Sequence, residues 1–458
     1  MKNRYICISI KPFRKVQSAL ALAIYISTTA SYAIDFGPDG MFTLTGFGQV
    51  TTGLQGNYCQ DCQVAPSTVS KQLKSADAII PGQSYKSVGT TFWQIQPYLS
   101  AKYNLGGGYE ISGMLSQRWR ASTVNGASPE TRYGGTVDVP DYWAEKNVAL
   151  SHQDYGSLRV GSMTTRAWSV SDFPYGTNID LAWAWASSGA GYGLLANAIR
   201  VGTRKFDVNE GDLFLEVTYD QGNTNFKRLK PAFFEIYAQY YKGDLVVDAM
   251  YQDATNGGAG AWGKAPFSGV TPFSQDDNYV SPSGTQFEGN KQSIAVIMAR
   301  YQLSARTEIS GGVRRNYWSG ASVVFNPATQ WTSAFNVDYT NPLATTNPGY
   351  SAVSADLMLG LRYRMDRWTF ITGMVYLGTA DTKNPSDRGQ NNSALINTLG
   401  VRYEYAKNLQ LETTFGMVQY AKQGLSPMSM PGNASFSNVD SRIATNGNWM
   451  TVGTVYRF

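Results

Sequence analysis

The C-terminal segment Asn448–Phe458 alternates between two kinds of side chain, and this alternation constrains the fold more than any other feature. In an extended strand, one face carries Met450, Val452, Thr454, Tyr456 and Phe458, and the other carries Trp449, Thr451, Gly453, Val455 and Arg457. The first face suits hydrocarbon, with a tyrosine near its edge, whereas the second needs water around its arginine. This pattern fits one strand of a membrane barrel, although a half-buried strand of a soluble protein would also show it.

Similar alternating segments of about ten residues recur along the whole chain, and sixteen can be counted. They are Phe42–Gly53, Thr91–Tyr103, Tyr109–Arg120, Trp143–His152, Ser157–Met163, Leu194–Phe206, Leu213–Tyr219, Phe233–Tyr241, Leu245–Asp253, Gln292–Leu303, Thr307–Tyr317, Ala355–Arg364, Trp368–Leu377, Leu395–Tyr405, Leu409–Tyr420 and Asn448–Phe458. Short connections alternate with long ones that are rich in Gly, Ser, Asn and Pro. This asymmetry is typical of periplasmic turns and extracellular loops, and the even strand number places both termini on the periplasmic side.

The charges on one face of these segments distinguish a barrel from a sandwich. That face would hold Arg118, Arg120, Arg200, Arg204, Arg314, Arg362, Arg364, Glu216, Glu235 and Asp248. Burying so many charges in a dry core would be prohibitive, whereas facing a water-filled lumen costs little. The sequence therefore predicts an all-β fold, a sixteen-stranded antiparallel transmembrane β-barrel.

Composition and aromatic placement agree with a membrane barrel. No apolar segment reaches the ~18 residues of a transmembrane helix, and the 46 glycines, 29 tyrosines and 11 tryptophans fit many short strands with tight turns. Tyrosines recur on the apolar face near the periplasmic ends of alternate strands, which indicates an aromatic belt. They are Tyr103, Tyr240, Tyr301, Tyr363, Tyr403 and Tyr456. Pro97 interrupts a strand, and we expect a bulge there.

The N-terminal segment has the features of a secretory signal peptide. Five basic residues precede the short apolar run Val16–Ile26, and small residues lead to Ala33. We expect a signal peptide over 1–33 and a single barrel domain over 34–458. The five basic residues leave with the signal, so 33 of the 38 basic residues remain against 33 acidic ones. A neutral mature chain gives no electrostatic support for nucleic-acid binding.

Several stretches resemble Gram-negative general porins of the β-proteobacterial type. They are Tyr103–Glu110, Asn147–Ser151 followed by Asp154–Gly161, and the terminal Tyr456-Arg457-Phe458. The resemblance covers the mature chain, and the order of these motifs carries it more than any one of them. It implies an outer-membrane barrel of sixteen strands, a homotrimer, and a third long loop that folds into the pore.

The third long connection, from about Thr164 to Tyr192, is the candidate for a loop that constricts the pore. It has few charges and many aromatic residues, so full exposure to water would be unfavourable. Its acids are Asp172 and Asp180, and its aromatic residues include Trp168, Phe173, Tyr175, Trp183 and Trp185. The wall residues expected to face it are Arg118, Arg120, Arg159, Arg200, Arg204 and Arg314. Arginines opposite acids would orient solutes and favour anions, but each arginine could instead pair with Glu216, Glu235 or Glu412 and brace the wall.

Other motifs give little support for chemistry. Cys59 and Cys62 form a Cys-x-x-Cys in the first extracellular loop, where a disulfide is favoured over a metal site. His152 is the only histidine, so a hydrolytic triad has no support. We expect no enzyme activity, no cofactor and no metal.

The predicted function is passive diffusion of small hydrophilic solutes and ions, with a weak preference for anions. Its surroundings would be the lipid bilayer and lipopolysaccharide. Two alternatives remain open at this point. One is a channel selective for a carboxylate or a sugar, in which the loop aromatics would stack on the sugar. The other is a surface protein whose long loops, such as Asn256–Asn290 and Ser319–Ser354, bind or attach.

Overall fold

The structure is a computed structural model of the 458-residue chain. The residues it describes are 33–58, 85–86, 90–122, 128–129, 143–180, 194–220, 232–255, 291–319, 323–326, 330–333, 351–379, 381–382, 388–391, 393–422 and 446–458. The signal-peptide prediction therefore falls almost entirely outside the described residues, as do Cys59 and Cys62.

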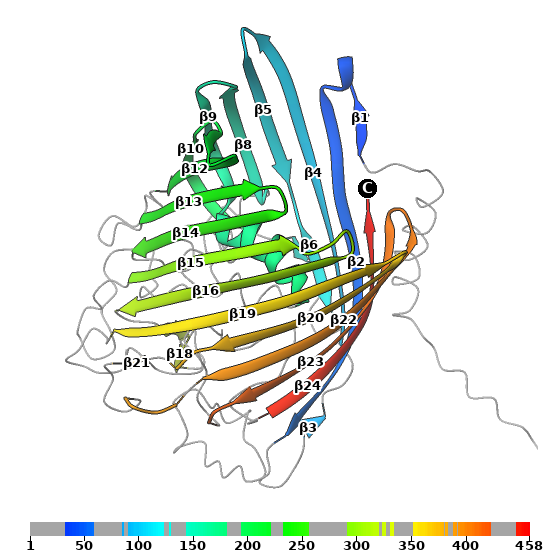
Figure 1. Cartoon of the computed structure of the whole chain (residues 1–458), viewed down its shortest axis with the longest axis vertical. Helices are drawn as coiled ribbons and strands as arrows, with labels where there is room; N and C mark the ends of the chain where they lie inside the picture. The colour runs from blue at the N-terminus through cyan, green and yellow to red at the C-terminus, as the bar shows by residue number, and fades with distance from the viewer. Residues whose placement is uncertain are drawn as a thin grey trace, which may run out of the picture.

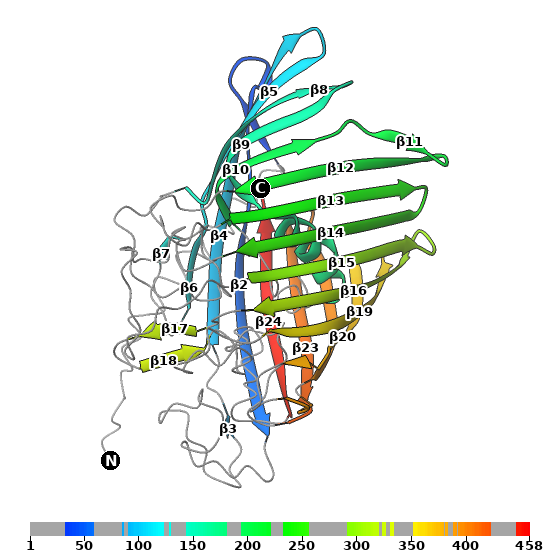
Figure 2. The same cartoon turned by 90° about the vertical axis from the view of Figure 1, so that its left-hand side faces the viewer.

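Sixteen antiparallel strands form a closed barrel, as the sequence predicted (Figures 1 and 2). In order around the ring they are β2 (Phe42–Tyr58), β4 (Thr90–Gly106), β5 (Tyr109–Ser116), β8 (Glu145–His152), β9 (Gly156–Thr164), β10 (Leu194–Gly202), β12 (Gly211–Asp220), β13 (Ala232–Lys242), β14 (Leu245–Thr255), β15 (Lys291–Gln302), β16 (Thr307–Ser319), β19 (Ala352–Met365), β20 (Trp368–Leu377), β22 (Ala394–Ala406), β23 (Leu409–Tyr420) and β24 (Asn446–Arg457). The ring closes because β2 pairs with β4 on one side and with β24 on the other.

Shorter elements accompany the ring. Six of them pair alongside it: β1 (Ile34–Phe36), β3 (Tyr85–Lys86), β6 (Trp119–Ser122), β7 (Ser128–Pro129), β11 (Phe206–Val208) and β21 (Asp381–Thr382). A separate hairpin consists of β17 (Val323–Asn326) and β18 (Gln330–Ser333). The helical segments are the short η1 (Pro38–Gly40) and the π-helical η3 (Ala167–Gly176). Among the described residues, no helix is long and apolar enough to cross a membrane.

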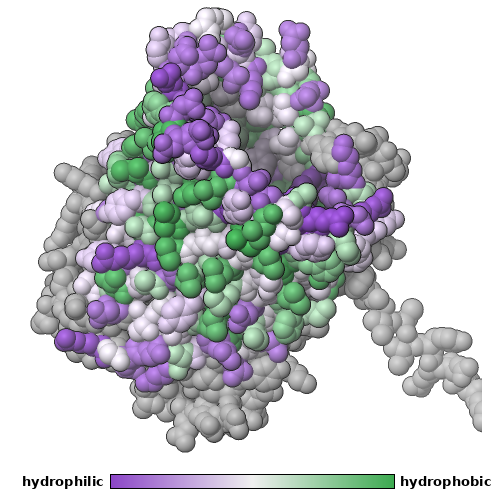
Figure 3. Space-filling view, viewed as in Figure 1, coloured by the Kyte–Doolittle hydropathy of each residue, from purple (hydrophilic) through white to green (hydrophobic). Residues whose placement is uncertain are grey.

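Side chains alternate between an apolar outer face and a polar inner face along each strand. On β12, Leu215, Val217 and Tyr219 are exposed on the outside, while Glu216 and Thr218 are buried inside. In Figure 3 apolar residues spread over the middle of the outer surface, and hydrophilic residues gather at its rim. The period-two pattern of the sequence thus becomes an apolar band around a polar interior.

The short turns expected on the periplasmic side lie at one end of the strands. The turn between β4 and β5 shows why glycine is needed there, because Gly106, Gly107 and Gly108 all have positive φ angles. A side chain on Gly108 would also meet the His152 ring, with Nε2 only 2.8 Å from the added Cβ. This turn therefore requires a residue without a side chain, both for its conformation and for its packing.

Two expected strands are interrupted, and the expected bulge at Pro97 is wrong. The segment predicted as Tyr109–Arg120 divides into β5 and β6 around Gln117 and Arg118. The register between β2 and β4 runs through Pro97 without a shift. Pro97 lies opposite the gap between β5 and β6, where the backbone N–H of Gln117 donates to the Pro97 carbonyl at 3.4 Å. The reciprocal hydrogen bond is missing because proline has no N–H, so the ladder is interrupted at this point without a bulge. The segment predicted as Leu194–Phe206 likewise ends its main ladder at Gly202.

An arginine at Val313 tests whether the outer face meets hydrocarbon. Val313 lies midway along β16 and is 51% exposed on the outside. Val313→Arg should destabilise the barrel in lipid vesicles by about 2–4 kcal/mol, because it moves a cation into the bilayer centre. Urea unfolding in vesicles measures this cost. The control is Gln94→Arg on the inner face, which should cost much less, and equal costs for the two variants would contradict the assigned orientation.

The barrel interior and its internal loop

The segment after β9 leaves the wall and crosses the barrel interior. Tyr175 in η3 contacts β14, and Asp180, four residues after η3 ends, contacts β22 and β23. The path from Thr164 to Asp180 therefore extends from β9 past most of the β12–β23 wall. We call this segment the internal loop, and three groups of contacts hold it in place.

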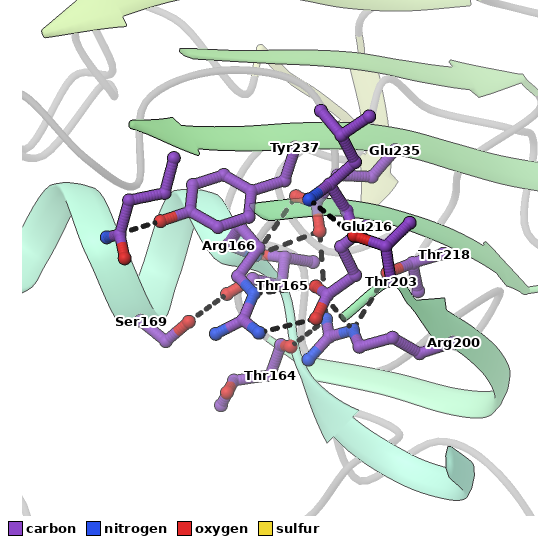
Figure 4. Close-up of polar contacts among 12 residues, drawn as sticks. Thr164, Thr165, Arg166, Ser169, Arg200, Thr203, Glu216, Thr218, Glu235 and Tyr237 are labelled. Carbon is purple, nitrogen blue, oxygen red and sulfur yellow. Dashed lines mark hydrogen bonds and ion pairs between the residues drawn. The ribbon is translucent and has the colours of Figure 1, made fainter. Parts of the chain in front are cut away.

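The first group is an ion-pair cluster at the base of the loop (Figure 4). Arg166 donates from Nε and Nη2 to the two carboxylate oxygens of Glu216, with both distances 2.6 Å. The backbone N–H of Arg166 donates to Glu235, 3.0 Å from each carboxylate oxygen. Arg200 on β10 completes the cluster, with its Nε 3.1 Å from Glu216 and its Nη2 3.7 Å from Glu235.

The charges of this base cluster balance, with two guanidinium groups against two carboxylates. The Glu235 side chain is completely buried and only 9% of the Arg200 side chain is exposed, so neither charge is well hydrated. A buried carboxylate of this kind depends on its partners, and removing one partner typically costs ~3–5 kcal/mol. Arg200 also donates to the hydroxyl of Thr218 and to the carbonyl of Thr164. Arg200 therefore braces the wall, which is the alternative that the sequence left open for each arginine.

The second group joins the middle of the loop to β13 and β14 through tyrosines. The Tyr175 hydroxyl donates to one oxygen of Asp248 at 2.7 Å, and the Tyr237 hydroxyl donates to the other at 2.5 Å. Gln239 also donates to Asp248, at 2.8 Å. Burial, followed by the neighbouring Asp248 carboxylate, raises the pKa of the Tyr175 hydroxyl, so this group stays protonated and remains a donor.

The third group holds the tip of the loop against β16 to β23. Asn178 donates to Glu308 at 2.5 Å and accepts a hydrogen bond from Arg362 at 2.8 Å, while Arg362 and Glu308 form an ion pair of 2.9 Å. Asp180 pairs with Arg402 at 2.6 Å and accepts a hydrogen bond from Thr414. The Asp180 carboxylate, which the sequence suggested as a charge facing the pore, is thus neutralised by the wall that it contacts.

Two of the predicted wall arginines are neighbours, since Arg159 lies opposite Arg200 in the β9–β10 ladder, and the others lie apart from them. Arg314 pairs with Asp356 at 2.8 Å, with both side chains almost fully buried. Arg159 donates to Asn147 at 2.5 Å, and Arg118 is buried where β5 ends. Arg204 lies in the exposed segment between β10 and β11, over the Phe206 ring. Arg120 has its backbone in β6, but its side chain lies outside the described residues.

The predicted loop aromatics are only partly described. Tyr175 is completely buried, so it fills the space between loop and wall and offers no surface on which a sugar could stack. The backbones of Trp168, Asp172 and Phe173 lie in η3, while their side chains lie outside the described residues. Trp183 and Trp185 fall wholly outside the described residues.

Sequence reasoning missed several residues that hold the loop, most of all Arg166. Arg166 is the only basic residue between Thr164 and Tyr192, and it comes just after a strand. The inner faces of β12 and β13 carry Glu216 and Glu235. A single arginine in the loop close to two inward-facing acids could therefore have indicated this ion pair. Asn178 carries no comparable signal, because its role depends on the register of β16 and β19. Within the described ranges, no group of His, Cys, Asp and Glu side chains is arranged to hold a metal ion.

Comparisons with known proteins place this architecture among solved porin structures. By sequence, no family model and no curated protein matches the chain. By structure, the anion-selective porin from Comamonas acidovorans matches 91% of this chain and all of its own, at 12% identity and a TM-score of 0.51. The OmpF of Salmonella typhi, solved with daunomycin, matches 93% of this chain and all of its own, at 14% identity and a TM-score of 0.51. The trimer form of OmpT from Vibrio cholerae matches 91% of this chain and 99% of its own, at 12% identity and a TM-score of 0.52.

The chain has the porin fold. The match covers nearly the whole length on both sides, so the likeness concerns the entire barrel and not one hairpin. The fold implied by the sequence resemblance is thereby confirmed.

Removing the side chain of Arg166 tests how the loop is anchored. Arg166→Ala leaves Glu216 with one guanidinium partner in place of two, and we expect a loss of stability of about 3–5 kcal/mol. The loop should also become sensitive to proteases in the folded, detergent-solubilised protein. Limited proteolysis with mass spectrometry measures this sensitivity. Arg204→Ala removes an exposed arginine and should change neither property, and equal protection in both variants would mean that the cluster does not hold the loop.

Proposed function

We propose that the chain is an outer-membrane porin that allows small hydrophilic solutes and ions to diffuse passively. The observation that carries the proposal is a closed barrel with an apolar outer face, a polar inner face and a loop that spans the interior. An apolar belt is suited to hydrocarbon, and a lumen lined by hydrogen-bonding groups is suited to water. The solved porins that share this fold support a channel over an enzyme.

The internal loop acts in this proposal as the constriction that limits solute size. It occupies part of the interior and is held against the β12–β23 wall, so solutes pass on its other side. The inner face there carries amides beside a carboxylate, since Gln94 donates to Gln49, and Gln49 in turn donates to Glu412. A surface of this kind exchanges hydrogen bonds with water and with polar solutes of many shapes, which fits a general channel.

The weak anion preference rests on basic residues that have no carboxylate partner among the described residues. Lys102, Arg300, Arg364 and Arg457 face the interior by strand parity, in the halves of their strands near the short turns. Arg200, Arg314 and Arg402 have their charges matched by acids, so they contribute little to the field in the lumen. In this proposal the second set of basic residues contributes most to the anion preference, because Arg200 and Arg314, two of the arginines predicted from the sequence, are paired with acids. The Comamonas porin, named as anion-selective, has the same fold.

Assembly and export complete the proposal. The chain would form a homotrimer surrounded by lipid and lipopolysaccharide, and the trimer form of the Vibrio OmpT supports this assembly. Export would use the signal peptide 1–33, and the first described strand begins at Ile34, directly after the expected cleavage site.

The two alternative functions have less support. Tyr175 is buried and cannot stack on a sugar, so a sugar-selective channel has one fewer candidate residue. The alternative of a surface attachment protein depends on loops that lie almost wholly outside the described residues.

Single-channel recording tests the proposed function. The purified protein in a planar bilayer should give large conductance steps, in groups of three if the trimer inserts as a unit. Under a salt gradient the reversal potential should fall modestly on the anion side. A folded barrel that inserts but passes no current would overturn the proposal.

Neutralising the unpaired arginines tests the source of selectivity. The double variant Arg300→Gln with Arg364→Gln should move the reversal potential toward the cation side, because it removes positive charge that no acid compensates. The matched control is Arg314→Gln with Asp356→Asn, which removes one charge of each sign and should leave selectivity unchanged. If the two double variants gave the same reversal potential, these residues would not determine selectivity.

A further inference from the structure

The tip of the internal loop contacts the barrel wall where the wall has no side chains. Ile179 is completely buried there. Gly360 on β19 and Gly373 on β20 lie directly opposite each other in the ladder, on the inner face. A Cβ built on Gly373 would lie 2.5 Å from the Cβ of Ile179 and 2.7 Å from its Cα. A Cβ on Gly360 would lie 2.7 Å from Cγ2 of the same residue, so neither position has room for a side chain while the isoleucine side chain is in place.

The contact continues onto the next strand. On β22, Thr398 pairs with Gly373 and donates from its hydroxyl to the carbonyl of Ile179. Two residues further along β22, a Cβ on Gly400 would collide with the carboxylate of Asp180. We name Gly360, Gly373 and Gly400 the glycine socket. It receives the tip, while Arg402 and Thr414 hold the Asp180 carboxylate from the side.

Glycine inside a strand weakens the strand, so its use at three neighbouring inner positions needs a reason. Gly311 on β16 provides the comparison, since it lies on the outer face of the same wall. A Cβ on Gly311 would meet its nearest neighbour, Cδ2 of Leu359, at 3.4 Å. Gly360, Gly373 and Gly400 on the inner face are therefore approached closely by the loop tip, whereas Gly311 on the outer face has no comparable neighbour.

We infer that the glycine socket determines the width of the passage by fixing the loop tip against the wall while the channel conducts. The inference rests on the proposed function, because it assigns pore-determining positions within that channel. Positive φ at Asp180 adds to it, since the chain adopts a left-handed conformation to bring this carboxylate to Arg402. Gly360 and Gly373 touch no solute, and they act by positioning Ile179. The docked tip is thus a static part of the pore and not a gate.

A side chain in the socket should narrow the passage. Carbon atoms pack at about 3.5–4.0 Å, so a methyl group at Gly373 would move the tip roughly 1 Å toward the centre of the lumen. We expect Gly373→Ala to lower single-channel conductance and Gly373→Val to lower it further. Gly311→Ala, the control on the outer face, should conduct like the parent. Unchanged conductance in Gly373→Ala, with folding verified by circular dichroism, would overturn the inference.

A reversible cross-link tests whether the loop tip lies in the glycine socket, and it does so without pushing the tip away from the wall. In a background with Cys59→Ser and Cys62→Ser, the variant Ile179→Cys with Gly360→Cys replaces a branched side chain by a smaller one and adds a thiol opposite it. Oxidation with copper phenanthroline should form a disulfide, seen as a reducible change in gel mobility. The oxidised and reduced forms should conduct equally. Failure to cross-link in the folded barrel, or a fall in conductance on oxidation, would contradict a tip that is docked in the conducting state.

The same cross-link separates this inference from the proposed function. A parent protein without conductance would refute the channel, whereas disulfide formation would still report whether the tip lies in the socket. A conducting parent that forms no disulfide would refute the socket alone.

Discussion

The rest of the structure depends on the pairing between the first and last strands of the ring. Lipid offers no hydrogen bonds, so every backbone N–H and C=O at membrane depth must find a partner within the protein. The ladder between β2 and β24 supplies the last of these pairings and leaves the sheet without an edge. The C-terminal Phe458 extends it through two backbone hydrogen bonds with Gly46. Once the ring is closed, the apolar face must point outward and the charges must point inward.

Closure then creates a second demand, which is to satisfy the charges that point inward. The chain meets it in two ways. Beneath the internal loop, where water is excluded, acids and arginines form ion pairs or hydrogen bonds, as Glu235 and Asp248 do. Away from the loop, Lys102 and Arg364 remain exposed and hydrated. The same strands therefore provide both the anchors of the loop and the charges that solutes meet.

The barrel could be predicted from sequence because its signal is local and repeated. Alternation with period two fixes which residues face outward, and the interior position of Arg200 and Glu216 followed from parity alone. The partners of these residues could not be predicted in the same way. Arg166 meets Glu216 only because a loop folds back across two strands, and Asp180 meets Arg402 across more than two hundred residues of chain. Pairings of this kind depend on tertiary geometry, which a single sequence does not contain.

Pro97 illustrates the same limit on a smaller scale. Its missing N–H suggested a bulge, but the register runs on without a shift and the neighbouring strand divides into β5 and β6 at that point instead. The sequence of one strand could not reveal this adjustment in the other. The contact that Gly360 and Gly373 make with the loop could likewise not be predicted from the sequence. A glycine in a strand gains meaning only when the segment that approaches it is known, and here that segment comes from a distant loop.

Residue-by-residue solvent access along β2 tests the central claim most directly. Single cysteines at positions 49, 50, 51 and 52, in a background without Cys59 and Cys62, would be treated in lipid vesicles with a charged, membrane-impermeant maleimide. A water-filled barrel predicts that cysteines replacing Gln49 and Thr51 react, while those replacing Val50 and Thr52 are protected by lipid. Uniform labelling, or labelling of the opposite pair, would contradict a ring of strands that is apolar outside and wet inside.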